Sequence, residues 1–317
     1  MISLVIPVYG NAENISALLA ALTDLDRRLA GALEVVFVVD GSPDDSHARL
    51  AAALPTQAFR SQLLSLSRNF GSFAAIRAGL QEARGGRFAV MAADLQEPPE
   101  LVQTFDERLR SGRCDIVIGT RATRADPALA RVGSGAFWFA YRRWVQPEIP
   151  VGGVDVFGCT HQVRDEILKL EESNSSLVGL LFWVGFRREL VPYHRRARTS
   201  GRSAWTFAKK VRYLSDSVFN FTDLPVRLLF RIGFLGTFAS ILAAAVVIVA
   251  KLTSRITVPG YTATVLTVVF FGALNCLGLG IIGGYVWRTL ENTKSRPNFL
   301  VASRASFEGT SPRSEAP

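Results

Sequence analysis

Short apolar runs alternate with amphipathic helical patterns over the first 121 residues. Each run is short enough for one strand, and each helical pattern places apolar residues three and four positions apart. The expected strands are 2–6 (stopped by Pro7), 33–39, 63–66, 88–92 and 116–118, and the expected helices begin after Asn14, after Gly71 and at Pro99. These repeated units predict an α/β fold with a Rossmann-like, mostly parallel sheet, whose ligands bind beyond the carboxyl ends of the strands.

Two long stretches near the C-terminus contain no charged residue. They run from Ile232 to Ala250 and from Ile256 to Trp287, and each supplies the roughly 20 apolar residues that cross a bilayer. We therefore expect two transmembrane helices, with a buried helical hairpin of a soluble protein as the alternative. Basic residues outside these stretches, including Arg227, Arg231 and Arg288, outnumber those between them, which predicts that both termini face the cytoplasm.

The same patterns divide the chain into four parts. We expect a globular domain at 1–204, juxtamembrane amphipathic helices at 205–230, two transmembrane helices at 231–290 and a tail at 291–317 that is disordered from about Ser303. Apolar residues at helical spacing, mixed with Lys209, Lys210 and Arg212, favour a helix on the membrane surface in the second part. A core-facing helix fits that pattern nearly as well.

Composition narrows the classes of function. The 317 residues include 36 Lys and Arg against 27 Asp and Glu, and the net charge of +9 suits phosphate-bearing substrates or an anionic membrane surface. We find no motif that reads nucleic-acid bases, so the charge alone does not indicate nucleic-acid binding. No Gly-x-Gly-x-x-Gly or P-loop motif follows an expected strand, which disfavours a dinucleotide oxidoreductase or a P-loop enzyme.

Candidate chemistry lies just past the strand expected at 88–92. Asp94 and Gln96 are two positions apart, so along an extended chain their oxygens would point the same way. A carboxylate and a carbonyl oxygen suit Mg²⁺ or Mn²⁺, which also bridges substrate phosphates. On spacing alone, a structural role for Asp94 in the turn before the next helix is equally well supported.

A series of short motifs runs along nearly the whole chain. They are Val5-Ile6-Pro7-Val8-Tyr9, Asp40-Gly41-Ser42, Arg68-Asn69-Phe70-Gly71, Ala93-Asp94-Leu95-Gln96-Glu97-Pro98-Pro99, Gly119-Thr120-Arg121, Tyr193-x-Arg195-x-x-Arg198-x-x-Gly201-x-Ser203 and Thr293-Lys294-x-Arg296-Pro297. Their order and spacing resemble the family-2 glycosyltransferases of the polyprenyl-phosphate sugar synthase type, such as dolichol-phosphate mannose synthase and the bactoprenol glucosyltransferases.

That resemblance implies a GT-A-type domain and a metal-dependent, inverting reaction. A sugar would pass from a nucleotide diphosphate sugar, with UDP-glucose as the expected donor, to a membrane polyprenyl (undecaprenyl) phosphate. The product would serve cell-envelope glycan modification. The expected location is the bacterial inner membrane, with the catalytic domain in the cytoplasm.

The resemblance also implies roles for single residues. Pro7, Tyr9, Glu13, Asp40 and Asp94 would bind the nucleotide sugar; Asp94 and Gln96 would hold Mg²⁺ or Mn²⁺; Arg121, Arg131, Arg195, Arg198 and Ser203 would bind the acceptor phosphate; and Asp94, Asp155 and Arg121 would be catalytic. Independently of the resemblance, arginines suit phosphate because a guanidinium group pairs with two of its oxygens. The motifs depart from the family pattern at Val39 and Ala92, where an acidic residue is usual.

Two other functions stay open. A processive polysaccharide or glycolipid synthase would carry Gln-x-x-Arg-Trp, and the nearest match, at residues 140–144, lacks the glutamine. A nonenzymatic membrane scaffold with a degenerate transferase domain is disfavoured because Asp94, Gln96 and Arg121 are retained. The sequence names neither the sugar nor the oligomeric state, so a homo-oligomer also stays open.

Overall fold

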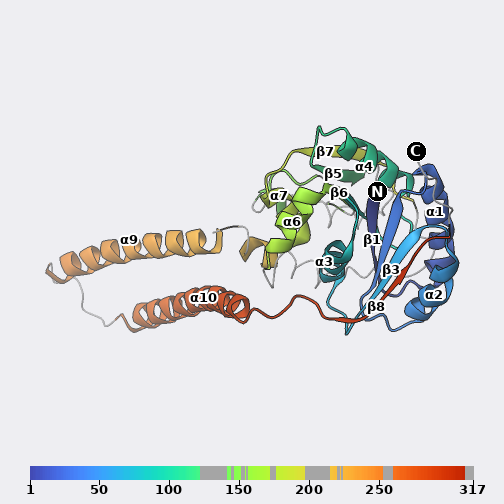
Figure 1. Ribbon diagram of the computed structural model, residues 1–317. Helices are drawn as coiled ribbons and strands as arrows, with labels where there is room; N and C mark the ends of the chain where they lie inside the picture. The colour runs from blue at the N-terminus through green and yellow to red at the C-terminus, as the bar shows by residue number, and fades with distance from the viewer. Residues whose placement is uncertain are drawn as a thin grey trace. The chain divides into compact units, whose positions relative to one another are not determined.

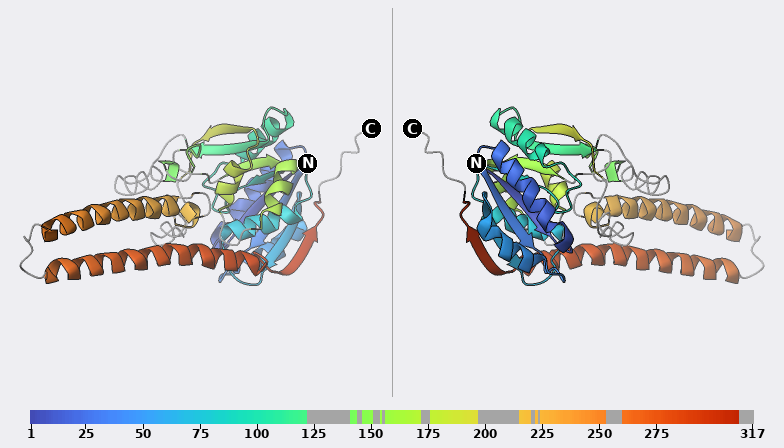
Figure 2. Two further views of the ribbon diagram at one scale, coloured as in Figure 1. Left: turned by 90° about the vertical axis from the view of Figure 1, so that its left-hand side faces the viewer. Right: turned by 90° about the vertical axis from the view of Figure 1, so that its right-hand side faces the viewer.

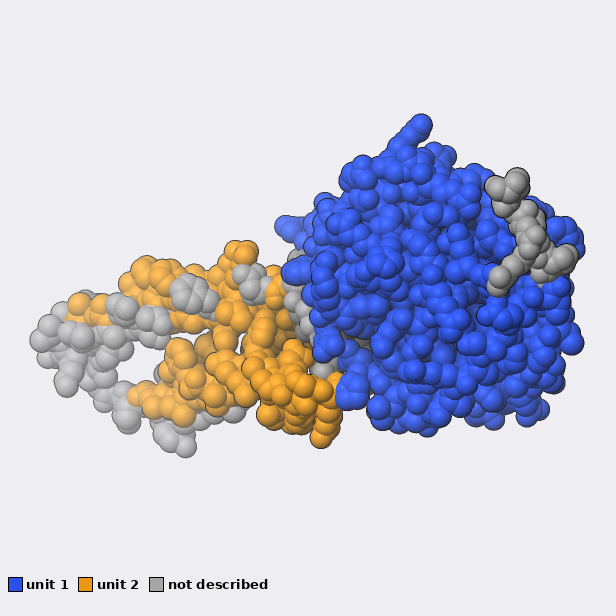
Figure 3. Space-filling model, viewed as in Figure 1, with its two compact units in different colours: residues 1–212, 297–317 blue, residues 213–296 orange. Residues whose placement is uncertain are grey.

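The chain divides into two compact units, residues 1–212 with 297–317 and residues 213–296 (Figure 3). The computed structural model describes residues 1–121, 141–143, 146–150, 154, 156–171, 176–196, 215–219, 222, 224–252 and 260–310. The predicted boundary after residue 204 falls outside these ranges.

Within the described residues, eight strands of the first unit form one sheet in the order β7-β5-β6-β4-β1-β2-β3-β8 (Figure 1). The strands are β1 (Ile2–Val8), β2 (Leu33–Val39), β3 (Arg60–Leu66), β4 (Arg87–Val90), β5 (Ile116–Arg121), β6 (Phe157–Thr160), β7 (Arg188–Tyr193) and β8 (Val301–Phe307). Strands β4, β1, β2 and β3 pair in parallel, as do β5 and β7, whereas β6 and β8 run antiparallel to their neighbours. The predicted α/β class is confirmed, with a sheet that is mixed.

Helices cover both faces of this sheet (Figures 1 and 2). The core on one face joins α1 (Ile15–Arg28), α2 (Ser46–Ala53) and α4 (Glu100–Arg110) to alternate residues of β1 and β2. On the other face α3 (Ser72–Glu82) packs against β1 and β2, with α6 (His161–Lys169) beside it. Because both faces of the central strands are buried, β1 and β2 are almost wholly apolar. The helix α7 (Leu177–Trp183) precedes β7.

Pro7 does not end the first strand, contrary to the sequence-based expectation. Strand β1 continues to Val8, and Pro7 lies opposite Val38 of β2. On its other side β1 pairs with β4 only as far as Val5, because β4 ends at Val90. The missing N–H of Pro7 therefore costs no hydrogen bond within the sheet.

The prediction of disorder from Ser303 is wrong for the segment up to Phe307. Strand β8 pairs antiparallel with β3, so that Phe307 lies opposite Ser61 and Ser303 opposite Ser65. An edge strand of this kind is held by backbone hydrogen bonds, while most of its side chains stay exposed. The polar composition that suggested disorder does not oppose such pairing.

In the second unit, residues 232–250 lie in the long helix α9 (Leu224–Leu252), and residues 261–287 of the second uncharged stretch lie in the long helix α10 (Tyr261–Thr293). Among the described residues, none of the helices combines the length and apolarity needed to cross a membrane, so the prediction of two transmembrane spans is not supported. Arg227 and Arg231, expected to flank the first span, lie inside α9. Residues 205–214 of the predicted amphipathic segment are outside the described ranges, and residues 215–219 are helical.

Candidate functional site

The topology brings most of the sequence-predicted residues to one edge of the sheet. Strands β1, β2, β3, β4, β5 and β7 share one direction, because β6 runs antiparallel to both β4 and β5. Pro7 is the residue before the end of β1, and Tyr9 and Glu13 follow that strand. Asp40 follows β2, Asp94 and Gln96 follow β4, Arg121 ends β5, and Arg195 follows β7. The carboxyl ends of strands that share a direction meet at one edge, where α/β folds bind their ligands.

Asp94 and Gln96 lie in a turn and not along a strand. Strand β4 ends at Val90, and Leu95 has a φ of 55°, in the left-handed region. The backbone N–H of Gln96 donates to Asp94 Oδ1 at 3.3 Å, which is a weak turn-closing hydrogen bond. The argument from strand alternation is therefore wrong, although Asp94 is nearly buried at this edge.

Arg195 joins this turn to the end of β7. Its Nη2 donates to Gln96 Oε1 at 2.6 Å, and the backbone N–H of Arg196 donates to the Gln96 carbonyl at 2.8 Å. Its Nε lies 3.8 Å from Oε1 of Glu97, a carboxylate that is 1% exposed. A predicted metal ligand and a predicted phosphate-binding arginine are thus in direct contact across 99 sequence positions.

Asp40, predicted to bind the nucleotide, holds the loop that follows β3. Its Oδ1 accepts from the N–H of Phe70 at 2.7 Å, and its Oδ2 accepts from the N–H of Gly71 at 2.8 Å. Burial raises the pKa of Asp40, and these two hydrogen bonds and the nearby Arg68 oppose the rise. The resulting structure fixes the Arg68–Gly71 motif at the start of α3.

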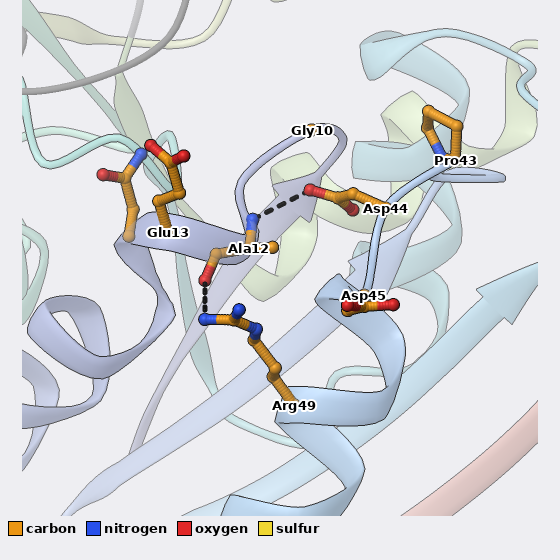
Figure 4. A pocket seen from close by; sticks show the side chains of 8 residues that line it. Gly10, Ala12, Glu13, Pro43, Asp44, Asp45 and Arg49 are labelled. Carbon is orange, nitrogen blue, oxygen red and sulfur yellow. Dashed lines mark hydrogen bonds between the residues drawn. The ribbon is translucent and has the colours of Figure 1, made fainter.

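A pocket of about 560 Å³ lies between the 3₁₀ turn Ala12–Asn14 and the start of α2 (Figure 4). Glu13, predicted to bind the nucleotide, lines it together with Asp44, Asp45 and Arg49. Asp94 and Asp40 do not line this pocket.

Asp44, which the sequence analysis did not single out, connects the loops after β1 and β2. Its Oδ2 accepts from the N–H of Ala12 at 2.9 Å (Figure 4). Its Oδ1 accepts from Ser42 Oγ at 2.6 Å and from the N–H of Ser46 at 3.2 Å. Partial burial acts to raise the pKa of Asp44, but the hydrogen bonds outweigh it and lower the pKa to about 2. The Ser-Pro-Asp-Asp-Ser run before α2, rich in helix-capping residues, was the available signal.

The remaining predicted residues differ in how the structure places them. Arg121 lies opposite Tyr193 in the β5–β7 pair, and Tyr193 is two residues before Arg195. Tyr9, which follows β1, is 48% exposed. Asp155, Arg131, Arg198 and Ser203 lie outside the described residues, so their predicted roles stay predictions.

The donor set for a divalent metal rests on Asp94. The described part of the chain shows no group of three or more His, Cys, Asp or Glu side chains arranged for a metal ion. Magnesium accepts one carboxylate when substrate phosphates and water complete its shell, and Asp94 can supply that carboxylate. Gln96 Oε1 already accepts from Arg195, but a carbonyl oxygen has a second lone pair. Asp94 and Gln96 can therefore hold a divalent metal ion together when substrate phosphates complete the coordination shell.

Comparison with known proteins shows similarity over almost the whole chain. The chain is 33% identical over 301 residues to the putative glycosyltransferase CsbB of Bacillus subtilis (strain 168), covering 95% of this chain and 91% of that protein. It is 29% identical over 304 residues to the bactoprenol glucosyl transferase of Shigella phage SfX, covering 96% of this chain and 99% of that protein.

A solved structure with a similar fold is glucosyl-3-phosphoglycerate synthase from Mycobacterium tuberculosis in complex with Mn²⁺, UDP and phosphoglyceric acid. The TM-score is 0.50 at 15% identity, covering 68% of this chain and 76% of that chain. This likeness supports a GT-A-like fold. The sequence model of glycosyl transferase family 2 matches residues 3–164, just over half of the 317 residues. With this match and the 33% identity over 95% of its length, the chain belongs to glycosyl transferase family 2.

Proposed function

We propose that the protein transfers a sugar, with glucose from UDP-glucose as the expected case, to a polyprenyl phosphate lipid. The observation that carries the proposal is the contact between Arg195 and Gln96, because it brings the guanidinium group of Arg195, the side chain proposed to bind phosphate, beside the turn of Asp94. An arginine beside the turn that carries the predicted metal ligand suits a site that handles both a diphosphate leaving group and a phosphate acceptor. The names of similar proteins, bactoprenol glucosyl transferases among them, support the lipid acceptor and the glucosyl donor.

In the proposed reaction, a phosphate oxygen of the lipid attacks the anomeric carbon of the sugar. The bond between that carbon and the diphosphate oxygen breaks, the nucleoside diphosphate leaves with the bonding electrons, and the configuration inverts. A phosphate monoester has a second pKa of about 6, so the attacking oxygen needs little help from a base at neutral pH. Arg195 would orient this phosphate and offset its charge.

A divalent cation held by Asp94 and by the substrate would neutralise charge on the leaving diphosphate. The Mn²⁺ and UDP in the structurally similar synthase support this part of the proposal. Asp94 also accepts a weak hydrogen bond from the backbone N–H of Gln96, whose side chain accepts from Arg195, so the proposed metal ligand and the proposed acceptor-binding arginine contact the same residue.

Because the proposed acceptor is a lipid, we propose that the reaction takes place at a membrane, with the cytoplasmic face of the bacterial inner membrane as the expected site. Large apolar side chains are exposed on the helices of the second unit, among them Phe234, Leu235 and Phe238 of α9 and Val286 and Trp287 of α10. Exposed apolar surface of this kind supports contact with lipid.

A donor panel tests the proposal. The purified full-length protein is incubated with undecaprenyl phosphate in detergent, with Mg²⁺ or Mn²⁺, and with UDP-glucose, UDP-galactose, UDP-N-acetylglucosamine or GDP-mannose in turn. We expect release of UDP that depends on the lipid, highest with UDP-glucose, and loss of release after chelation of the metal. Release of a nucleoside diphosphate that is equal without the lipid would contradict the proposed acceptor.

A further inference from the structure

Strand β8 returns to the first unit after the helices of the second unit and is anchored along its whole length. It pairs with β3 from Phe307, opposite Ser61, to Val301, opposite Leu66. Beyond its far end, the backbone N–H of Thr310 donates to the Gln57 carbonyl at 3.1 Å. Arg304 in the middle of the strand lies 3.0 Å from Glu82 at the end of α3. The strand is therefore an integral part of the sheet.

The first residues of β8 lie beside the start of the loop that follows β3, at the sheet edge that carries the candidate site. The pairing shifts register between Ser65 and Leu66, and the N–H of Ser67 then donates to the Leu300 carbonyl at 2.9 Å. The residue after Ser67 is Arg68, the first of the Arg68–Gly71 loop. Leu300 itself lies four residues after Arg296, where the second unit ends.

The other end of the same loop is held by the residues that follow β2. Asp40 accepts from the N–H groups of Phe70 and Gly71, and Gly41 packs so closely on the loop that a Cβ there would lie 2.4 Å from the Asn69 nitrogen. The loop is thus held at two places, by Asp40 within the transferase fold and by Leu300 from the C-terminal segment.

We propose that the C-terminal segment Leu300–Phe307 is a positioning element of the transferase site, which fixes the Arg68–Gly71 loop through Ser67. Its removal would free one of the two attachments of the loop and weaken the hydrogen bonds from the loop to Asp40. Only the catalytic consequence rests on the proposed function. The structural consequence, faster opening of the loop, does not.

Amide hydrogen exchange measures the structural consequence directly. The test variant is a chain that ends at Arg296, and the matched control is a chain that ends at Thr310 and keeps β8. We expect exchange at Phe70 and Gly71 to rise about tenfold or more in the first chain, and to stay at the wild-type rate in the second. Unchanged protection of both amides in a folded chain ending at Arg296 would overturn the proposal.

A second pair of variants covers the case in which the shorter chain does not fold. Ser67→Pro removes the N–H that bonds Leu300, whereas Ser67→Ala keeps it. Phe307→Ala weakens the far end of β8, where Phe307 packs against the core, and controls for general loss of stability. Faster exchange of Phe70 and Gly71 in Ser67→Pro, but not in Ser67→Ala or Phe307→Ala, supports the proposal. Equal acceleration in Phe307→Ala and Ser67→Pro would refute it.

The catalytic consequence is read in the same proteins from the Michaelis constant for the donor. We expect Ser67→Pro to raise this constant, while Phe307→Ala lowers the melting temperature and leaves the constant near the wild-type value. If the wild-type protein transfers no sugar, the proposed function fails, and the exchange result still decides the role of β8. If it transfers sugar and Ser67→Pro leaves both the constant and the exchange unchanged, the positioning role fails alone.

Discussion

Among single side chains, Arg195 has the contacts that matter most for the proposed chemistry. Its guanidinium group is bonded to Gln96 and faces the buried carboxylate of Glu97, so its position is set before substrate binds. Losing a charged partner of a phosphate costs about 1.5–3 kcal/mol, roughly ten- to a hundredfold in affinity. We predict that Arg195→Ala lowers the specificity constant for polyprenyl phosphate by this factor, and that Arg195→Lys restores only part of it.

Arg196 provides the control for that prediction. It is exposed and lies 3.5 Å from Glu100 on the surface, a kind of ion pair that contributes about 0–1 kcal/mol. Arg196→Ala should therefore leave acceptor kinetics nearly unchanged, because its backbone bond to Gln96 remains. Equal losses in both variants, measured in steady-state assays, would show that the position of Arg195 has no special role.

The sequence identified Asp94, Gln96 and Arg195 as candidates but could not show how they meet. The left-handed φ of Leu95 turns the chain between the first two, and a leucine gives no signal for such a conformation. The bond from Arg195 to Gln96 spans 99 positions, and spacing rules reach only the residues of one element. The family resemblance identified these residues as candidates, but only the structure shows which of them are in contact.

Among the elements, the turn after β2 imposes the tightest steric demand near the site. Gly41 has a φ of +57° and its Cβ would overlap the backbone of Arg68 and Asn69. Gly10 has a similar φ of +67° but has no atom within 4 Å of the position of a Cβ. Both substitutions to alanine incur about 1–2 kcal/mol of left-handed strain, and only Gly41→Ala adds about 1–3 kcal/mol of overlap.

We therefore predict that Gly41→Ala lowers the thermal unfolding midpoint of the first unit clearly more than Gly10→Ala does. Calorimetry on the two variants measures the difference, and the common strain at positive φ cancels. Equal midpoints would mean that the Arg68–Gly71 loop shifts freely, against the close packing described for it.

The loop connection through Asp44 should depend on acid pH. The pKa of this carboxyl is about 2 in the folded protein, below the value of about 3.9 for an unperturbed aspartate. A lowered pKa means that the ionised group stabilises the fold above pH 4, and that this contribution is lost as the pH falls from about 4 to about 2. In Asp44→Asn, the free energy of unfolding should therefore decrease less than in the wild type as the pH falls from about 4 to about 2.

Denaturant unfolding at pH 7, 4 and 2.5 measures this effect, with Asp45→Asn as the control. Asp45 is the residue before α2 and its side chain makes no capping hydrogen bond, so its substitution should preserve the wild-type pH dependence. An unaltered pH dependence in Asp44→Asn would contradict the assigned hydrogen bonds.

Element prediction succeeded where the pattern of apolar residues was strong. The expected strand at 33–39 has the same bounds as β2, and the helix expected after Gly71 is α3. The short strands β6, β7 and β8 were missed. Strand β6 has only four residues, and most residues of β7 and β8 are not buried, so none of the three shows a distinct period. Each is held by pairing with a distant strand, which sequence patterns do not record.

At the scale of the whole molecule, sequence patterns predicted the transferase fold better than the C-terminal part. The family resemblance predicted an α/β domain, and both the family match and the mixed sheet confirm it. The predicted division into consecutive parts missed that residues 297–317 belong to the first unit. A chain that leaves a domain and returns to it pairs residues far apart, so local composition cannot reveal the return.

Recovery of labelled sugar in lipid tests the central claim most directly. The purified full-length protein is given UDP-glucose labelled in the sugar, undecaprenyl phosphate and Mg²⁺, and the label in the organic extract is counted for the wild type and for Asp94→Asn. We predict label in the extract only with wild-type protein and lipid together, while Asp94→Asn stays folded by circular dichroism and transfers none. The account would be contradicted if Asp94→Asn transferred sugar at the wild-type rate, or if the wild-type protein formed no labelled lipid with any nucleotide sugar.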